Sequence, residues 1–169
     1  MFRTIIWATD GSDAADGALA FTEELARALG SKIVAVHATH LVSGGFNGGA
    51  SLAEDDDVQR KIKGQVEGLR SRGLDARLNV RLSPHKDTPH AIVEAAEDHE
   101  ADLIVVGTHG KGGVPSALFG GVAKRLARLA SCPVLVVPAH VKIRTHGLAE
   151  TSSELHRPRY GVSQDVASL

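Results

Sequence analysis

The sequence has little of several features that mark particular classes of protein. One cysteine, Cys132, is present among 169 residues, so no disulfide can form within the chain, and a reducing compartment is favoured. Lysine and arginine total 19 and aspartate and glutamate 20, a formal net charge of −1, which gives no footprint for nucleic acid or anionic membrane. No apolar run approaches the roughly 20 residues of a membrane helix, and no signal-peptide pattern precedes the first apolar segment. We therefore expect a cytoplasmic protein that binds neither nucleic acid nor membrane.

The pattern of apolar residues indicates alternating strands and helices within one domain, and 43% of the residues are hydrophobic. Short apolar segments predict strands over residues 4–9, 33–38, 76–82, 103–106 and 133–137. Periodic segments predict one helix between a cap at Ser12 or Asp13 and Gly30, and others over residues 54–72, 91–99 and 122–130. Residues 39–53, which contain two Gly-Gly pairs, are expected to form a long loop.

The strand segments lack polar alternation, which is typical of strands buried on both faces of a parallel sheet. The run from Leu103 to Val106 is an example. Alternation of strands and helices with right-handed crossovers then predicts an α/β, Rossmann-like fold, in which a doubly wound five-stranded parallel sheet has the order 3-2-1-4-5 and helices on both faces. The apolar period ends near residue 139, so we expect a domain over residues 1–138 and a polar, poorly ordered tail over residues 139–169.

Two segments should meet at the carboxyl edge of this sheet, where doubly wound folds bind their ligands. Residues 8–12, Ala-Thr-Asp-Gly-Ser, follow the first strand, and residues 107–113, Gly-Thr-His-Gly-Lys-Gly-Gly, follow the fourth. Glycines let backbone amides approach phosphate oxygens closely. Gly120 and Gly121 open a later helix, whose free amides favour an anion. The interpretation is a phosphate cradle, and the alternative is that the glycines form ordinary turns.

Spacing excludes two familiar phosphate motifs. A Walker loop needs Ser or Thr after Gly-Lys, whereas Gly110-Lys111 is followed by Gly112. The dinucleotide fingerprint needs three spaced glycines after the first strand, whereas Asp10-Gly11-Ser12 follows it. Asp10 has the alternative role of helix cap. If Asp10 were the phosphoacceptor of a receiver domain, the site would need a neighbouring acidic pair and a lysine after a late strand, and neither partner is evident.

The nine histidines do not predict a metal site. The closest pairs are His37 with His40 and His85 with His90, but strand alternation separates the first pair, and no carboxylate or cysteine completes a four-ligand set. Cys132 precedes a buried strand and is interpreted as a small core residue. Since no Ser-His-Asp or Cys-His arrangement has a signature context, neither catalytic nor metal-binding residues are predicted.

The glycines after the fourth strand belong to a longer pattern. Gly107-x-x-Gly110 is followed after nine residues by Gly120, with Ala-Asp-Leu-Ile-Val-Val before it and Ser-Cys-Pro-Val-Leu-Val-Val-Pro at residues 131–138. The segment from Ile5 to Asp10, followed by Gly-Ser, lies near the start of the chain and forms the first part of the same pattern. This pattern resembles the universal stress protein family and its ATP-binding signature over roughly residues 1–138.

The resemblance implies that the chain binds ATP, with or without Mg²⁺, and assigns a place to each residue of the site. Asp10 would contact the adenosine end of the nucleotide, and Ala8 and Thr9 would line the same pocket. The Ala38 backbone would meet the adenine, and Val106 and Gly107 would lie near the ribose. The phosphates would meet the loop after the fourth strand and the start of the next helix. These two segments contain Thr108, His109, Gly110, Lys111, Gly120, Gly121 and Val122. Within that loop, His109 would stack on or bond to the nucleotide, and Lys111 would add a point charge.

One departure from the family pattern bears on affinity. ATP-binding members usually have Ser or Thr directly after the last motif glycine, and this chain has Gly121. A lost hydroxyl donor is worth about 0.5–1.5 kcal/mol, which weakens ATP binding without abolishing it.

The resemblance further implies a stress or dormancy role, absent or slow ATP hydrolysis, and a homodimer that pairs residues 133–137 with their twin. Two alternatives stay open. One is a dimeric interaction module that binds no nucleotide. The other is an enzyme such as an ATP-pyrophosphatase-type ligase, which would need a different loop at Asp10-Gly11-Ser12-Asp13.

Overall fold

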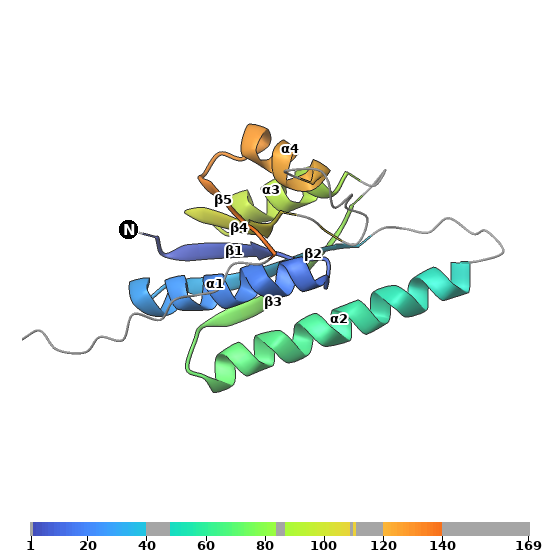
Figure 1. Cartoon of the computed structure of the whole chain (residues 1–169), viewed down its shortest axis with the longest axis horizontal. Coiled ribbons are helices and arrows are strands. Elements are labelled where there is room, and N and C mark those ends of the chain that lie inside the picture. The colour runs from blue at the N-terminus through green and yellow to red at the C-terminus, as the bar shows by residue number, and fades with distance from the viewer. Residues whose placement is uncertain (1, 40–47, 84–86, 109, 111–119, 140–169) are drawn as a thin grey trace, which may run out of the picture.

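The computed structural model describes residues 2–39, 48–83, 87–108, 110 and 120–139, with side chains omitted for residues 48–54. Within these ranges the elements alternate along the chain (Figure 1). In order they are β1 (Thr4–Ala8), α1 (Asp13–Leu29), β2 (Lys32–Thr39), α2 (Gly48–Ser71), β3 (Ala76–Leu82), α3 (Thr88–Asp98), β4 (Leu103–Gly107), α4 (Gly121–Leu129) and β5 (Val134–Val137).

The strands form one five-stranded sheet with the order β3-β2-β1-β4-β5. Every pairing is parallel, and the central strand β1 places Ile6 opposite Val34 on one side and Ile104 on the other. Figure 1 shows α1 and α2 on one face of the sheet and α3 and α4 on the other. The predicted fold class and strand order are confirmed.

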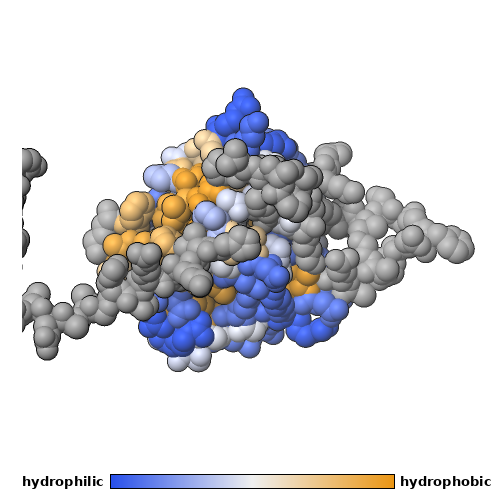
Figure 2. Space-filling view, in the orientation of Figure 1, coloured by the Kyte–Doolittle hydropathy of each residue, from blue (hydrophilic) through white to orange (hydrophobic). Residues whose placement is uncertain are grey.

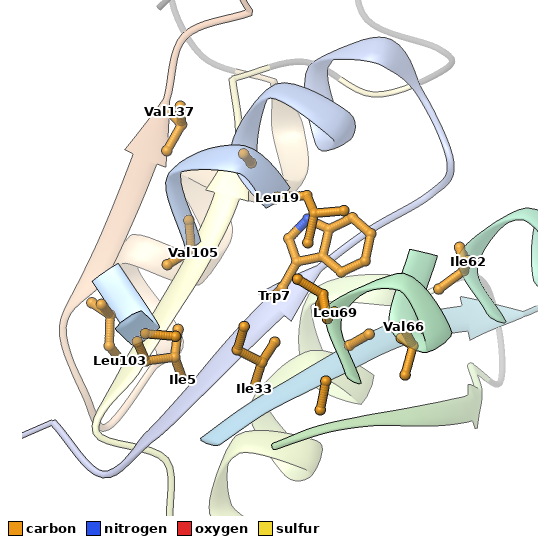
Figure 3. Close-up of a cluster of buried hydrophobic side chains, with 14 residues drawn as sticks. Ile5, Trp7, Leu19, Ile33, Ile62, Val66, Leu69, Leu103, Val105 and Val137 are labelled. Atoms are coloured by element: carbon orange, nitrogen blue, oxygen red, sulfur yellow. The ribbon is translucent and has the colours of Figure 1, made fainter. Parts of the chain in front are cut away.

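Alternate residues of the strands feed two separate cores, one on each face of the sheet. Ile5 and Trp7 face α1 and α2, whereas Ile6 and Ala8 face α3 and α4. Trp7 is fully buried at the centre of the first cluster (Figure 3). Its indole Nε1 donates to the Ala15 carbonyl at 3.0 Å, so its polar atom is satisfied and β1 is fixed against the first turn of α1.

Helix ends follow the local signals in part. Ser12 is the N-cap of α1, its hydroxyl accepting from the Ala15 amide at 3.3 Å, and Gly30 ends α1 in the left-handed conformation. The helix predicted over residues 91–99 begins earlier, at Thr88, because Pro89 is compatible with a first helical turn.

The loop predicted over residues 39–53 is wrong for its last part. Helix α2 begins at Gly48 instead of residue 54, and residues 40–47 lie outside the described part of the chain. Extending an existing helix adds one hydrogen bond for each residue fixed, so it continues through the Gly-Gly pair that we interpreted as a breaker.

No helix in the described ranges combines the length and apolarity needed to cross a membrane.

Candidate functional site

Residues 9–12 form the turn after β1 and are called the Asp10 turn below. Backbone and side-chain hydrogen bonds hold this turn in place. The Thr9 amide donates to the Val36 carbonyl at 3.0 Å, and the Thr9 hydroxyl accepts from the Gly11 amide at 3.1 Å. Asp10 Oδ1 accepts from the Ser12 amide at 3.0 Å. Gly11 has φ +76°, which favours glycine. Since Ser12 caps α1, Asp10 is not the helix cap, and its carboxylate is oriented at the sheet edge.

The segment after β4 packs directly against this turn. A β-carbon added to Gly107 would lie 2.8 Å from the Ala14 carbonyl oxygen, so β4 approaches the first turn of α1 closely enough to require glycine there. A β-carbon added to Gly110 would overlap Asp10 Oδ2. The glycine segment and the Asp10 carboxylate are therefore in contact, at the edge of the sheet where the two segments were predicted to meet.

The start of α4 joins the same edge through a backbone hydrogen bond. The Gly120 amide donates to the Thr108 carbonyl at 2.6 Å, and the Thr108 amide donates to the Val137 carbonyl at 3.0 Å. Gly120 is the N-cap of α4 and has no side-chain cap. Its amide is thus satisfied within the protein, whereas no acceptor among the described residues is found for the amides of Gly121, Val122 and Ala123.

The other predicted residues lie along the same edge. Ala8 and Val106 are direct partners in the β1–β4 ladder and both are buried. Ala38 is half-buried near the end of β2, opposite Arg81 of β3. His109 and Lys111 lie outside the described residues. The structure therefore brings together the ends of β1 and β4 and the start of α4, with Ala38 one strand away.

The sequence analysis missed the structural role of a buried histidine next to the Asp10 turn, because it considered His37 only as a metal ligand and rejected that role. His37, 5% exposed, has its Nδ1 3.0 Å from the Thr9 carbonyl oxygen and its Nε2 3.0 Å from Asp55 Oδ1 of α2. Asp55 Oδ2 accepts from the Thr39 hydroxyl at 2.6 Å and from Gln59 Nε2 at 2.9 Å. Partial burial by itself raises the pKa of Asp55, but the hydrogen bonds from Thr39, His37 and Gln59 outweigh it and lower this pKa below 3.8.

Helix α2 also contacts the Asp10 turn through Lys61, six residues after Asp55. Lys61 Nζ lies 2.7 Å from both the Gly11 carbonyl oxygen and Asp16 Oδ2. Gln65 Nε2 donates to Asp16 Oδ1 at 2.7 Å. Sequence analysis found none of these contacts. The polar period of α2 marks a solvent-facing side, and nothing local indicates which lysine reaches a loop 50 positions earlier.

On the opposite face, an ion-pair cluster joins α3 to α4. Asp87, just before α3, accepts from His90 Nδ1 at 2.7 Å and lies 3.2 Å from Arg125 of α4. Desolvation by itself raises the pKa of Asp87, but these two partners outweigh it and lower the net pKa. These contacts link the start of α3 to α4, whose first residues adjoin the site through the Gly120–Thr108 hydrogen bond.

Within the described ranges, no group of three or more His, Cys, Asp or Glu side chains is arranged to hold a metal ion. Cys132 is half-buried against the α3–α4 core, and burial raises the pKa of its thiol.

Comparison with known proteins gives a consistent result. The sequence profile of the Universal stress protein family matches residues 1–138. The chain is 34% identical over 140 residues to a universal stress protein of Thermus aquaticus, covering 81% of this chain and 99% of the relative.

Solved structures of the same family share the fold. The chain is 27% identical to the Archaeoglobus fulgidus universal stress protein solved in complex with dAMP, with a TM-score of 0.58 over 80% of this chain and 97% of that one. A universal stress protein family protein of Arabidopsis thaliana with AMP bound is 16% identical, with a TM-score of 0.59 over 80% and 91% of the two chains.

Proposed function

Since the chain belongs to the universal stress protein family, we propose that it binds an adenine nucleotide at the carboxyl edge of its sheet, with ATP as the ligand. The observation that carries the proposal is the meeting of two glycine segments with one carboxylate: Gly110 packs on Asp10, and Gly120 bonds to Thr108. The complex of dAMP with the 27% identical Archaeoglobus protein supports the ligand class.

The described residues fit a nucleotide with its phosphates toward α4. Asp10 is a fixed acceptor suited to ribose hydroxyl groups, with Ala8, Val106 and Gly107 beneath it. The Gly121 and Val122 amides and the positive end of the α4 dipole favour phosphate oxygens. The proposed ligand is ATP alone or with Mg²⁺ on its phosphates. His109 and Lys111 remain predicted ligand residues outside the described part of the chain.

The direct test is binding of ATP, AMP and Mg-ATP to the purified chain by calorimetry and by thermal unfolding. A ligand at 100 times its Kd adds about 2.7 kcal/mol to the free energy of unfolding and raises the Tm. Gly110→Ala should abolish this rise, because its methyl group displaces the Asp10 carboxylate. Gly64→Ala is the matched control, because a β-carbon there meets no described atom within 4 Å. If no adenine nucleotide changes the wild-type Tm, the proposal is wrong.

A second function is favoured by one observation. The Gly120 amide is already bonded to Thr108, and Gly121 carries no hydroxyl, so this site has fewer donors for phosphate than the sequence pattern suggested. A family member that binds no nucleotide and acts as a dimeric interaction module would fit those features. The same thermal experiment separates the two functions. Phosphate release in the ATP samples checks the prediction that hydrolysis is absent or slow.

The proposed assembly is a homodimer through β5. This strand ends the sheet, and its residues Val134, Leu135 and Val136 are only partly buried. Figure 2 shows hydrophobic surface gathered over this end of the molecule. An apolar edge strand is stabilised when it is covered, and pairing with its twin covers it. A mass equal to one chain at all concentrations would contradict this assembly.

The proposed setting is a stress or dormancy response in the cytoplasm, without nucleic acid or membrane as partner. Family membership supports the response, and the net charge of −1 supports the lack of nucleic acid and anionic membrane as partners. Loss of the protein should then alter survival under stress more than growth in rich medium.

A further inference from the structure

Helix α2 holds the Asp10 turn through three residues, two of them directly and one through His37. Asp55, Val58 and Lys61 are spaced by three residues, so each is a surface neighbour of the next along the helix; together they are called the α2 clamp. Asp55 reaches the Thr9 carbonyl through His37, and Lys61 bonds to the Gly11 carbonyl. Val58 packs so closely that a β-carbon on Gly11 would lie 2.9 Å from its Cγ1. Each contact falls on a residue adjacent to Asp10 in the chain, or on the histidine that holds such a residue.

The link through His37 is a pair of hydrogen-bond contacts. The Thr9 carbonyl can only accept a hydrogen bond, so His37 Nδ1 carries hydrogen and donates to it at 3.0 Å. His37 Nε2 lies 3.0 Å from Asp55 Oδ1, within hydrogen-bond distance. The buried ring is therefore held between the Thr9 carbonyl and Asp55, and the two contacts orient the Thr9 carbonyl more firmly than packing alone.

We propose that the α2 clamp positions the Asp10 turn for the nucleotide, with His37 and Lys61 as positioning residues, and that nucleotide occupancy is in turn transmitted to α2. The inference rests on the proposed function and adds its regulation. Binding at Asp10 and ordering of α2 are then linked equilibria, so whatever shifts one shifts the other by the same factor. Any partner that holds α2 in its clamped position would raise nucleotide affinity.

The decisive pair of variants is Lys61→Ala and Lys63→Ala. Both remove one lysine from an exposed position of α2, but Lys61 alone reaches the Asp10 turn among the contacts described. We expect Lys61→Ala to weaken ATP and AMP binding about two- to tenfold by calorimetry, with the urea midpoint of the free protein close to that of Lys63→Ala. Lys63→Ala should bind as the wild type does.

A spectroscopic readout tests the His37 link in the free protein. The ¹⁵N spectrum of the imidazole should show hydrogen on Nδ1, and Asp55→Asn should shift the Nε2 resonance. Asp55→Asn keeps the shape of the side chain, so a loss of nucleotide affinity of about fivefold or more would come from the altered contact with His37. A wild-type ring without hydrogen on Nδ1, or an Nε2 resonance that Asp55→Asn leaves unchanged, would overturn the link.

Hydrogen exchange of the amides over residues 55–62 tests the reverse direction of the coupling. Saturating ATP should slow exchange there in the wild type and in Lys63→Ala, and this protection should be smaller in Lys61→Ala. If the wild type binds nucleotide and both lysine variants bind equally well, the clamp is refuted while the proposed function stands. If the wild type binds no adenine nucleotide, both fall together.

Discussion

Restoring a hydroxyl at residue 121 should strengthen ATP binding. Gly121 is the first residue of α4, and a β-carbon there meets no described atom within 4 Å, so Gly121→Ser fits without displacing its neighbours. The serine hydroxyl would sit beside the amides of the first turn and add one donor toward the phosphates. A neutral hydrogen bond contributes about 0.5–1.5 kcal/mol, which corresponds to an affinity gain of about two- to tenfold.

Gly121→Ala is the control that isolates the hydroxyl. Both substitutions remove a flexible glycine from a helix, which stabilises the folded state by up to about 1 kcal/mol whatever the ligand. Only serine adds a donor. Calorimetric titration with ATP should therefore rank serine above alanine, and adenosine, which has no phosphate, should bind all three proteins equally.

Equal ATP affinity of the serine and alanine variants would refute this reasoning. It would mean that phosphates do not lie at the start of α4. A gain that appeared equally with adenosine would place the effect in the fold of the loop and not in a phosphate contact.

Two further predictions concern stability. Gly107→Ala should lower the free energy of unfolding by about 1–3 kcal/mol in urea titrations. Its methyl group would lie 2.8 Å from the backbone oxygen of Ala14, which cannot rotate away. An unchanged urea midpoint would contradict the close approach of β4 to α1. Asp102 accepts the amides of Thr4 and Arg3 at 3.0 and 2.7 Å, and these hydrogen bonds lower the pKa of its carboxyl below 3.8. Its stabilisation is therefore present above pH 3.8 and is lost as the pH falls through the lowered value, so the stability difference between wild type and Asp102→Asn should shrink on acidification. A difference that is constant from neutral to acid pH would argue against that role.

The sequence was sufficient for the fold class because its signals are local. The apolar run from Leu103 to Val106 needs burial on both faces, and Ser12 and Gly30 mark the ends of α1 by their own chemistry. Chirality of the crossovers then limits the order of the strands. The start of α2 was placed six residues too late because a helix can continue through Gly48 and Gly49 once its remaining turns are packed.

The candidate site was likewise predictable from the sequence only in part. That residues 8–12 and 107–110 end at one edge follows from the order of elements alone. That Gly110 touches the Asp10 carboxylate, and that Gly120 gives its amide to Thr108, depends on the distance between two loops. No periodicity or spacing encodes such a distance.

By itself, the sequence determined the order of strands and helices, the parallel sheet and the edge where its glycine segments come together, since these follow from side-chain period, capping and handedness. The tertiary structure alone decided that α2 lies across the Asp10 turn. His37 with Asp55 and Lys61 with Gly11 are joined across 18 and 50 positions of the chain. Contacts at such separations arise from how the helix is packed on the sheet, and local sequence carries no record of that packing.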